Sequence, residues 1–226
     1  MAVKVLSLHY KDSEGKESNL HSGIDFKTRT IHNEFRHRDD VVPTVFVPAR
    51  SIAGPAHVAQ QFSSLLKTKQ DRDAMEALRI IEPAVQRIEV LSEPSGPSIY
   101  LDIGLEALVP LAVCGEGMVR LFSIILELVA SRNGVLLIDE IDNGLHYSVM
   151  PKLWELLGML VEKHQVQVFG TTHNDDMMRS ALEAFAGKEG MLGLFRIDNR
   201  GDHHVMVSYS EEAMEAVLNV PFEVRG

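Results

Sequence analysis

The chain has 226 residues, of which 45% are hydrophobic and 24% are charged, a composition typical of a globular domain. Its formal net charge of −10 argues against general binding to duplex DNA, which needs a basic surface, although it leaves room for a local basic patch. No apolar run reaches the roughly 20 residues of a membrane helix, the N-terminus lacks the apolar core of a secretory signal, and the single cysteine excludes internal disulfides, so we expect a cytoplasmic protein without a membrane partner.

The N-terminal part of the sequence predicts β-strands. Residues 4–10 (KVLSLHY) alternate apolar and polar side chains like a half-buried strand, and the polar segment DSEGKES that follows is typical of a hairpin turn. Residues 23–26 and 29–35 predict further strands. The hydrophobic segment PTVFVPAR (43–50) is bounded by prolines, so we expect it to be extended and to lead out of the sheet.

Helical periodicity runs from residue 56 to about residue 81 and is interrupted near KTKQDRD, which predicts two helices. The segments RIEVL and SIYLDI then predict strands separated by the turn-forming SEPSGP. This stretch therefore predicts a helical segment followed by a β-hairpin.

From residue 114 onward, helices and strands alternate. The expected elements are a helix at 116–131, a buried strand at 134–139, a helix at 148–163, a strand at 165–171 and a helix at 175–186. Such alternation indicates parallel strands joined by crossover helices, and GVLLI and VQVFG are apolar on both faces, as expected of buried parallel strands. LGLFRI and HHVMVSYS predict a hairpin at the sheet edge, and Ser210 with the two glutamates after it suits the start of a last short helix. The predicted fold is α/β, a mostly parallel sheet with flanking helices plus an N-terminal antiparallel β portion.

The run GVLLIDEIDNGLH places acids directly after a buried strand. Ligands of open parallel sheets bind outside the carboxyl ends of the strands, where Asp139 and Glu140 lie. One acid there can hold Mg²⁺, and the next can orient or deprotonate an attacking water. The alternative is a buried strand that simply meets a solvated acidic turn.

The run VFGTTHN ends a second buried strand in two threonines and a histidine. If the two strands are neighbours, His173 comes near Asp139 and Glu140, where it can donate a hydrogen bond to a terminal phosphate or to the attacking water. The alternative is that Thr172 or Asn174 caps the next helix and His173 is merely exposed.

The run CGEGMVRL places Gly115 and Gly117 just before a helix. A glycine-lined helix N-terminus offers free backbone N–H groups and suits a phosphate, but a simple loop-to-helix turn explains the same pattern. The helix is otherwise nearly all apolar, so we expect it to be buried on most sides, and Cys114 to be a small buried residue rather than a nucleophile. Its polar residues fall on one narrow stripe, formed by Glu116, Arg120, Ser123, Glu127 and Ser131.

In this order, the three runs resemble the C-terminal lobe of the ABC-type ATPase domains of RecF-like and OLD-like proteins, which are AAA family ATPases. The resemblance covers about residues 98–186. It implies that Asp139 is the Walker B acid that holds Mg²⁺, that Glu140 is the catalytic carboxylate and that His173 is the switch histidine. The implied cofactors are ATP and Mg²⁺.

The same resemblance assigns dimer contacts. Asp142 to His146 is similar to the D-loop, which crosses a dimer interface. Gly115, Glu116 and Gly117 resemble the signature motif, which contacts the γ-phosphate bound to the opposite subunit. The common signature has a serine at the position of Gly115, so only backbone groups are left for that contact.

The sequence contains no G-x-x-x-x-G-K-[ST] motif, the Walker A loop that holds the β- and γ-phosphates. We therefore expect a single partial ATPase domain over 1–226, with a β-rich remnant of the N-terminal lobe at 1–50, a helical connection at 51–97 and the Walker B and signature lobe at 98–226. Turnover would then need a Walker A-bearing lobe or second chain. A homo- or heterodimer of ATPase domains is expected, with nucleic acid touched only indirectly.

Two other functions stay open at this point. The chain could be a non-catalytic partner or regulatory module that keeps the fold, which the missing Walker A motif favours and the presence of Asp139, Glu140 and His173 disfavours. It could also be a metal-dependent nuclease that uses Asp139, Glu140 and Asp142, although the GEG and TTH runs would then have no explanation.

Overall fold

A computed structural model describes the backbone of residues 4–11, 17–25 and 30–34, and both backbone and side chains of residues 43–49, 54–201, 203–210, 212–214 and 216. The chain divides into two compact units, Met1–Val42 and Pro43–Gly226. The boundaries predicted at residues 50 and 97 stay a prediction.

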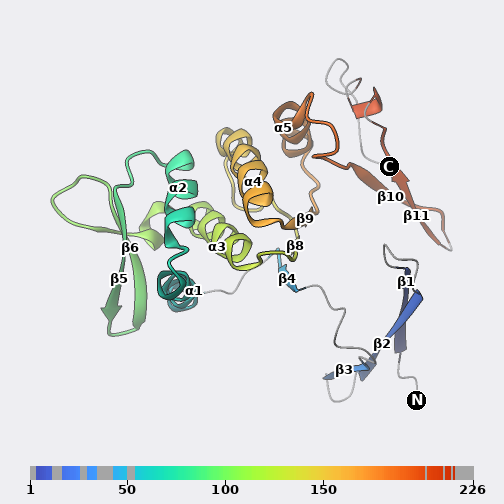
Figure 1. Ribbon diagram of the computed structural model, residues 1–226, viewed down its shortest axis with the longest axis horizontal. Coiled ribbons are helices and arrows are strands. Elements are labelled where there is room, and N and C mark those ends of the chain that lie inside the picture. The colour runs from blue at the N-terminus through green and yellow to red at the C-terminus, as the bar shows by residue number, and fades with distance from the viewer. Residues whose placement is uncertain are drawn as a thin grey trace. The chain divides into compact units, whose positions relative to one another are not determined.

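The first unit contains an antiparallel sheet of β1 (Lys4–Lys11), β2 (Glu17–Asp25) and β3 (Thr30–Glu34), coloured blue in Figure 1. Leu8 pairs with Leu20 across the first two strands. The N-terminal antiparallel portion is therefore confirmed. The second strand begins earlier than predicted and takes the last two residues of the predicted DSEGKES turn; residues 12–16 of that turn lie outside the described residues.

The second unit is built on a parallel sheet with the strand order β4-β8-β9. Its strands are β4 (Thr44–Val47), β8 (Val135–Ile138) and β9 (Gln167–Gly170). The segment PTVFVPAR is extended and lies outside the N-terminal sheet, as expected, but its pairing in the parallel sheet was not predicted: Thr44 pairs with Val135, and β4 forms one edge. Pro43 and Pro48 flank this short strand without interrupting its ladder, and an edge position tolerates them.

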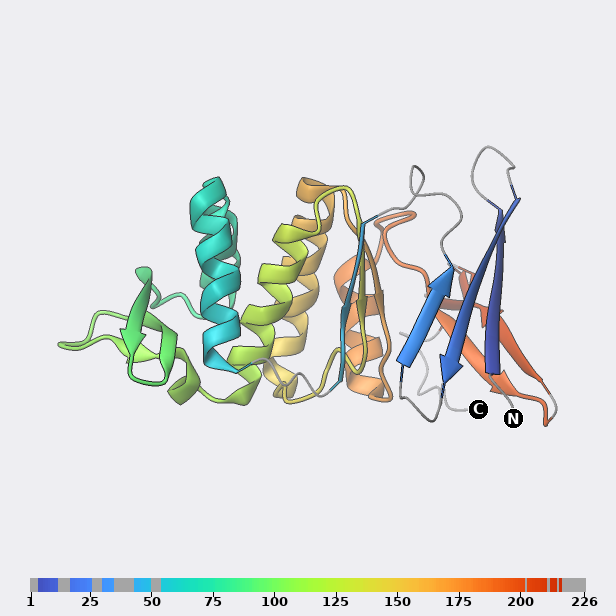
Figure 2. The ribbon, with the colours of Figure 1, turned by 90° about the horizontal axis from the view of Figure 1, so that it is seen from below.

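Five helices accompany this sheet: α1 (Pro55–Thr68), α2 (Asp71–Ile81), α3 (Glu116–Ala130), α4 (Met150–His164) and α5 (Asp175–Phe185). The predicted break between the first two falls at Lys69, whose φ of 59° ends α1 in a left-handed turn. Helices α3 and α4 lie alongside the sheet in both ribbon views (Figures 1 and 2). The α3 helix is buried on most sides, as predicted, with Phe122 and Ile125 fully buried.

The two faces of the parallel sheet differ in burial. Leu136 and Ile138 on one face are almost completely buried, whereas Phe46 and Phe169 on the other are 60% and 49% exposed. Phe46, Leu137 and Phe169 are paired across the three strands and form an apolar row. The prediction that both faces of β9 are buried is therefore wrong: β9 is an edge strand, and its outward face is open.

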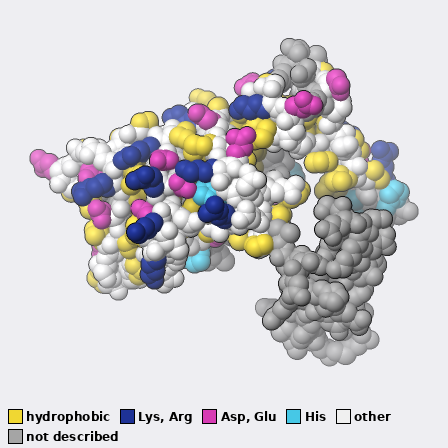
Figure 3. All heavy atoms as spheres, viewed as in Figure 1, with side chains coloured by type: hydrophobic (Ala, Val, Ile, Leu, Met, Phe, Trp, Pro, Cys, Tyr) yellow, Lys and Arg dark blue, Asp and Glu magenta, His cyan; other side chains and the backbone are white. Residues whose placement is uncertain are grey.

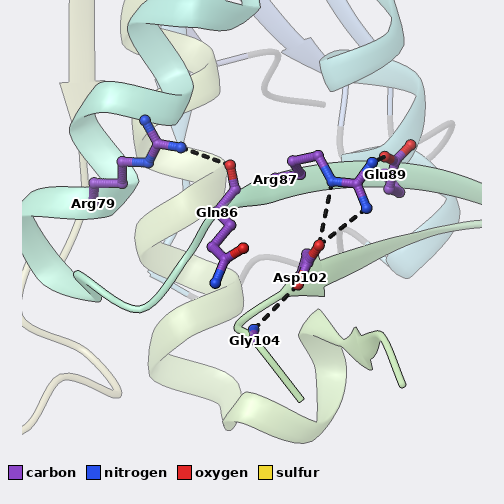
Figure 4. Close-up of polar contacts among 6 residues, drawn as sticks. All are labelled: Arg79, Gln86, Arg87, Glu89, Asp102 and Gly104. Carbon is purple, nitrogen blue, oxygen red and sulfur yellow. Dashed lines mark hydrogen bonds and ion pairs between the residues drawn. The ribbon is translucent and has the colours of Figure 1, made fainter. Parts of the chain in front are cut away.

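A β-hairpin of β5 (Arg87–Glu93) and β6 (Gly96–Asp102), extended by β7 (Val109–Pro110), packs against α1. Figure 4 shows its base, where Arg87 donates to Asp102 Oδ2 at 3.0 and 3.2 Å and Gly104 N donates to Asp102 Oδ1 at 3.1 Å. The backbone N–H of Gly104 and the guanidinium of Arg87 lower the pKa of Asp102. The hairpin base is joined to α2 by Arg79, which donates to Gln86 O at 2.6 Å.

The C-terminal strands β10 (Phe195–Asn199) and β11 (His204–Ser208) pair with each other. The predicted hairpin is confirmed, but its predicted place at the edge of the parallel sheet is wrong, because among the described strands the two form a separate sheet. Residues 212–214 are helical, and Ser210 Oγ accepts from Ala213 N at 3.3 Å, as its predicted position at a helix start requires.

Over the part of the molecule that carries α1 to α4, basic and acidic side chains are intermixed (Figure 3).

A buried histidine joins α2 to α4. His164 Nε2 lies 3.0 Å from Asp73 Oδ2, and Lys163 Nζ lies 2.8 Å from Asp73 Oδ1. Burial lowers the pKa of His164, the Asp73 carboxylate opposes that shift, and the charges of Lys163 and Arg132 add to it. His164 therefore favours the neutral form in the folded protein.

This arrangement predicts a pH-dependent stability. The unfolded chain takes up a proton at His164 near pH 6.5, and the folded chain does so only at lower pH, so the free energy of unfolding falls as the pH drops below about 6.5. We expect His164→Gln to weaken this loss between pH 7.5 and 5.5 in urea titrations. The exposed His57→Gln is the matched control. Equal pH slopes in all three proteins would contradict the prediction.

Candidate functional site

The acids Asp139 and Glu140 lie at the carboxyl end of β8, as the sequence predicts, and both are half-buried. Asp139 N donates to Val47 O at 2.9 Å and extends the ladder with β4 by one residue. Glu140 then has a φ of +44°, in the left-handed region that residues other than glycine seldom adopt. Such backbone strain is commonly stored at functional sites.

Two threonines at the end of β9 hold these acids. Thr171 Oγ1 donates to Asp139 Oδ1 at 2.7 Å and accepts from Glu140 N at 2.9 Å. Thr172 Oγ1 donates to Asp142 Oδ1 at 2.5 Å. The structure thus brings the predicted acidic run and the predicted TTH run together, and it assigns the threonines contacts that sequence reasoning missed.

His173 follows these threonines and is exposed. Asn174 caps α5, because its Oδ1 accepts from the backbone N–H groups of Asp176 at 2.9 Å and Met177 at 3.4 Å. Of the two residues expected as caps, Asn174 is the one that caps α5. Thr172 Oγ1 accepts from the N–H of Asn174 itself, at 3.0 Å. The role of His173 as the switch histidine stays a prediction.

The GEG run forms the turn into α3. Gly115 has φ +98° and ψ 157°, and its carbonyl accepts from the N–H groups of Met118 and Val119 at 3.1 and 3.3 Å. A backbone with this φ strongly favours glycine. Glu116 begins the helix and is exposed. Cys114, next to this turn, is also exposed, so the expectation of a buried cysteine is wrong: it ends a short 3₁₀ turn at the surface.

The GEG turn touches the loop that resembles a D-loop. A Cβ atom at Gly117 would lie 2.3 Å from Gly144 O, so the two backbones are in direct contact. In the same loop, His146 Nδ1 lies 2.9 Å from Ser148 Oγ, and its ring packs on Tyr147 at 4.2 Å between centroids. Asp142 contacts Thr172, so this loop is connected to both other runs.

Gly117→Ala is predicted to destabilise the protein. Alanine favours a helix over glycine by about 1 kcal/mol, yet the added methyl group would collide with the backbone of Gly144. We expect a net loss of about 1–3 kcal/mol in the free energy of unfolding, measured by urea denaturation.

The control for this substitution is Gly170→Ala, where the nearest atom, Ile141 Cδ1, would lie at an ordinary 3.4 Å. We expect it to change stability by less than about 0.5 kcal/mol. If Gly117→Ala were as stable as the wild type, the two loops would not be in contact.

Arg120 and Asn143 make further contacts at this site that sequence reasoning did not predict, since it placed Arg120 only in the polar stripe of the helix and Asn143 only within the run that resembles a D-loop. Arg120 is 9% exposed, and its guanidinium donates to backbone carbonyls at the ends of β4 and β8. Asn143 Nδ2 donates to Ala49 O at 2.8 Å. Burial lowers the pKa of Arg120, against the opposing effect of the carboxylates of Glu140, Asp142 and Asp139. The sequence signal that could have pointed to Arg120 was a single arginine in a helix that is otherwise nearly all apolar.

The oxygen atoms at this sheet edge fit a magnesium ion. Mg²⁺ in phosphate-binding sites takes one or two carboxylates, with waters and substrate phosphates as its other ligands. Asp139, bonded to the hydroxyl of Thr171, supplies a carboxylate of this kind. Within the described residues, no three Asp, Glu, His or Cys side chains form a cluster that could hold a metal ion.

Residues 3–178 match the family described as "AAA domain, putative AbiEii toxin, Type IV TA system". The chain belongs to this AAA domain family. An "ATP/GTP phosphatase" of Helicobacter pylori is 25% identical to this AAA domain over 138 residues, which is 59% of the chain and 37% of the relative. The chain thus spans little more than a third of that relative.

Solved structures of SMC ATPases share the fold of this AAA domain. An Smc head bound to the C-winged helix domain of ScpA has a TM-score of 0.58 and 14% identity, over 93% of this chain and 76% of that one. An SMC ATPase studied for ATP-driven dimerization and DNA-stimulated activation has a TM-score of 0.51 and 16% identity, over 73% and 99%. The predicted α/β fold with a parallel sheet and flanking helices is therefore confirmed. In the described part of the chain, every helix is too short or too polar to cross a membrane.

Proposed function

We propose that this AAA domain binds and hydrolyses ATP in a magnesium-dependent reaction, at the edge of the sheet formed by the ends of β8 and β9. The observation that carries the proposal is the junction of Asp139 and Glu140 with Thr171. It gathers a carboxylate suited to Mg²⁺ and a second, strained acid where ligands of parallel sheets bind. The family and the phosphatase relative support a nucleotide as that ligand.

Each residue has a proposed task. Asp139 holds the magnesium ion, oriented by its bond from Thr171. Glu140 orients the attacking water and accepts its proton, and His173 donates a hydrogen bond to the terminal phosphate. When bound, Mg²⁺ neutralises charge that develops on the phosphate oxygens.

The phosphates are proposed to be gripped partly from outside this chain. A Walker A-bearing lobe or second chain supplies the loop and lysine, and a homo- or heterodimer brings the Gly115–Glu116–Gly117 turn and the loop from Asp142 to His146 to the opposite subunit's nucleotide. The SMC ATPase neighbour that dimerises with ATP supports this arrangement. The resemblance to RecF-like and OLD-like proteins points to a role in antiviral defence or in DNA transactions in which nucleic acid is contacted indirectly. The DNA-stimulated activation studied for the SMC ATPase neighbour supports the second role.

The test is phosphate release from ATP with Mg²⁺, by the purified chain alone and co-expressed with a Walker A-bearing lobe. We expect release only from the assembled protein. Release by the chain alone that disappears in Glu140→Gln would support the ATPase and overturn the need for a second lobe. An assembly that binds ATP without releasing phosphate would instead favour the second candidate, a non-catalytic partner module, which the absence of a Walker A motif from the sequence supports.

A further inference from the structure

Arg120 is a buried cation, and in the described part of the chain its hydrogen bonds all run to backbone carbonyls. It lies on α3, one turn after the GEG run, and is 9% exposed. Nη1 donates to the carbonyls of Pro48 and Ala49 at 3.1 and 2.9 Å, and Nη2 donates to those of Asp139 and Glu140 at 2.8 and 2.9 Å. Burying a charge costs free energy, and the four charge-assisted hydrogen bonds offset that cost. A buried arginine with four such bonds at one place suggests that it holds these carbonyls in position.

The four carbonyls belong to the carboxyl ends of β4 and β8, two neighbouring strands of the parallel sheet. A guanidinium is planar and presents its donors in a fixed fork, so it holds both strand ends in one geometry. Asn143 strengthens the same link, because its Nδ2 donates to Ala49 O, one of the four carbonyls.

The link ends on the strained residue of the candidate site. Glu140 has a φ of +44°, and the direction in which its carboxylate leaves the backbone depends on that conformation. Three bonds hold it: its carbonyl accepts from Arg120 and from Asn143 N, and its N–H donates to Thr171 Oγ1. A strained backbone conformation persists only where several surrounding contacts hold it in place, as these three bonds do.

We propose that Arg120 is a positioning residue, whose guanidinium holds the backbone of Glu140 in the conformation that the proposed reaction requires. This inference rests on the proposed ATPase function. Because Arg120 is carried by the helix that the GEG turn begins, it also ties the position of Glu140 to the placement of that turn.

Amide hydrogen exchange tests the positioning without any need for turnover. The amides of Asp139, Glu140, Ile141 and Asn143 are all hydrogen-bonded, so their exchange reports on this turn. We expect Arg120→Met to accelerate the exchange of residues 140–143 by roughly tenfold or more, with little change in α4. The matched control is Arg87→Met, which removes an exposed arginine from the β5–β6 hairpin. Unchanged exchange at residues 140–143 in a folded Arg120→Met protein would overturn the proposal.

Kinetics of the assembled ATPase separate positioning from a general loss of structure. We expect Arg120→Met to lower kcat roughly 10- to 100-fold while KM for ATP changes by less than about threefold. Arg120→Lys keeps the charge but not the fork, so its effects are expected to be intermediate, and it replaces Arg120→Met if that variant does not fold. Normal kcat in either variant would overturn the proposal.

If the wild-type assembly releases no phosphate, the proposed ATPase function fails. The exchange comparison would still decide whether Arg120 holds Glu140. The two failures are therefore distinguishable.

Discussion

Glu140→Gln is expected to abolish most ATP turnover in a complete assembly, by roughly 10²- to 10⁴-fold, while ATP affinity stays nearly unchanged. Glutamine has the same shape but cannot accept the proton of an attacking water. It preserves the backbone bonds of Glu140 to Arg120 and Thr171, so the turn itself is expected to stay intact. The measurements are steady-state phosphate release and equilibrium binding of ATP.

The matched control for this substitution is Glu155→Gln, which removes an exposed carboxylate from α4. It is expected to turn over ATP like the wild type. If Glu140→Gln lost ATP binding together with turnover, Glu140 would be a structural residue, and the catalytic assignment would have to be given up.

Asp139→Ala is expected to remove the magnesium dependence of ATP binding. The wild-type assembly should bind ATP more tightly as Mg²⁺ is added, because one hard oxygen ligand of the ion comes from the protein. Without that carboxylate, titrations of ATP with and without Mg²⁺ should give the same affinity. Asp139→Asn can still accept a hydrogen bond from Thr171 and separates loss of metal binding from loss of this contact.

Asp102→Asn, which changes a remote carboxylate in the β5–β6 hairpin, should retain the full magnesium effect. An Asp139→Ala protein whose ATP affinity still rose with Mg²⁺ would refute the assignment of Asp139 as the Walker B acid.

The sequence predicted best what depends on local periodicity. The helices and most strands lie within a few residues of their predicted places, because the amphipathic or apolar pattern of an element depends only on residues close together in the sequence. The meeting of Asp139 with the TTH run was also predictable, since the ends of neighbouring parallel strands share one edge of the sheet.

Non-local features were missed. The pairing of β4 with β8 joins residues far apart in the sequence, and the flanking prolines predicted only that β4 leaves the N-terminal sheet, not which strand it joins. The four carbonyl contacts of Arg120 could not be predicted, because backbone acceptors leave no trace in residue identity. The contact of Gly117 with Gly144 was hidden for the same reason, as it joins two glycine backbones. The β10–β11 hairpin was predicted, but its separation from the parallel sheet among the described strands was not. A residue pattern predicts that a segment is a strand, and it does not determine which strand lies beside it.

The parallel sheet also constrains the order in which the chain can fold. Thr44 pairs with Val135, 91 positions further along, so β4 leaves the ribosome long before its partner strand exists. Helices α1 and α2 and the β5–β6 hairpin can form from local contacts during this interval, whereas the sheet has to wait for the closure of a long loop. Until then Phe46 and Val47 belong to an unpaired strand, the kind of segment that chaperones shield from aggregation during synthesis.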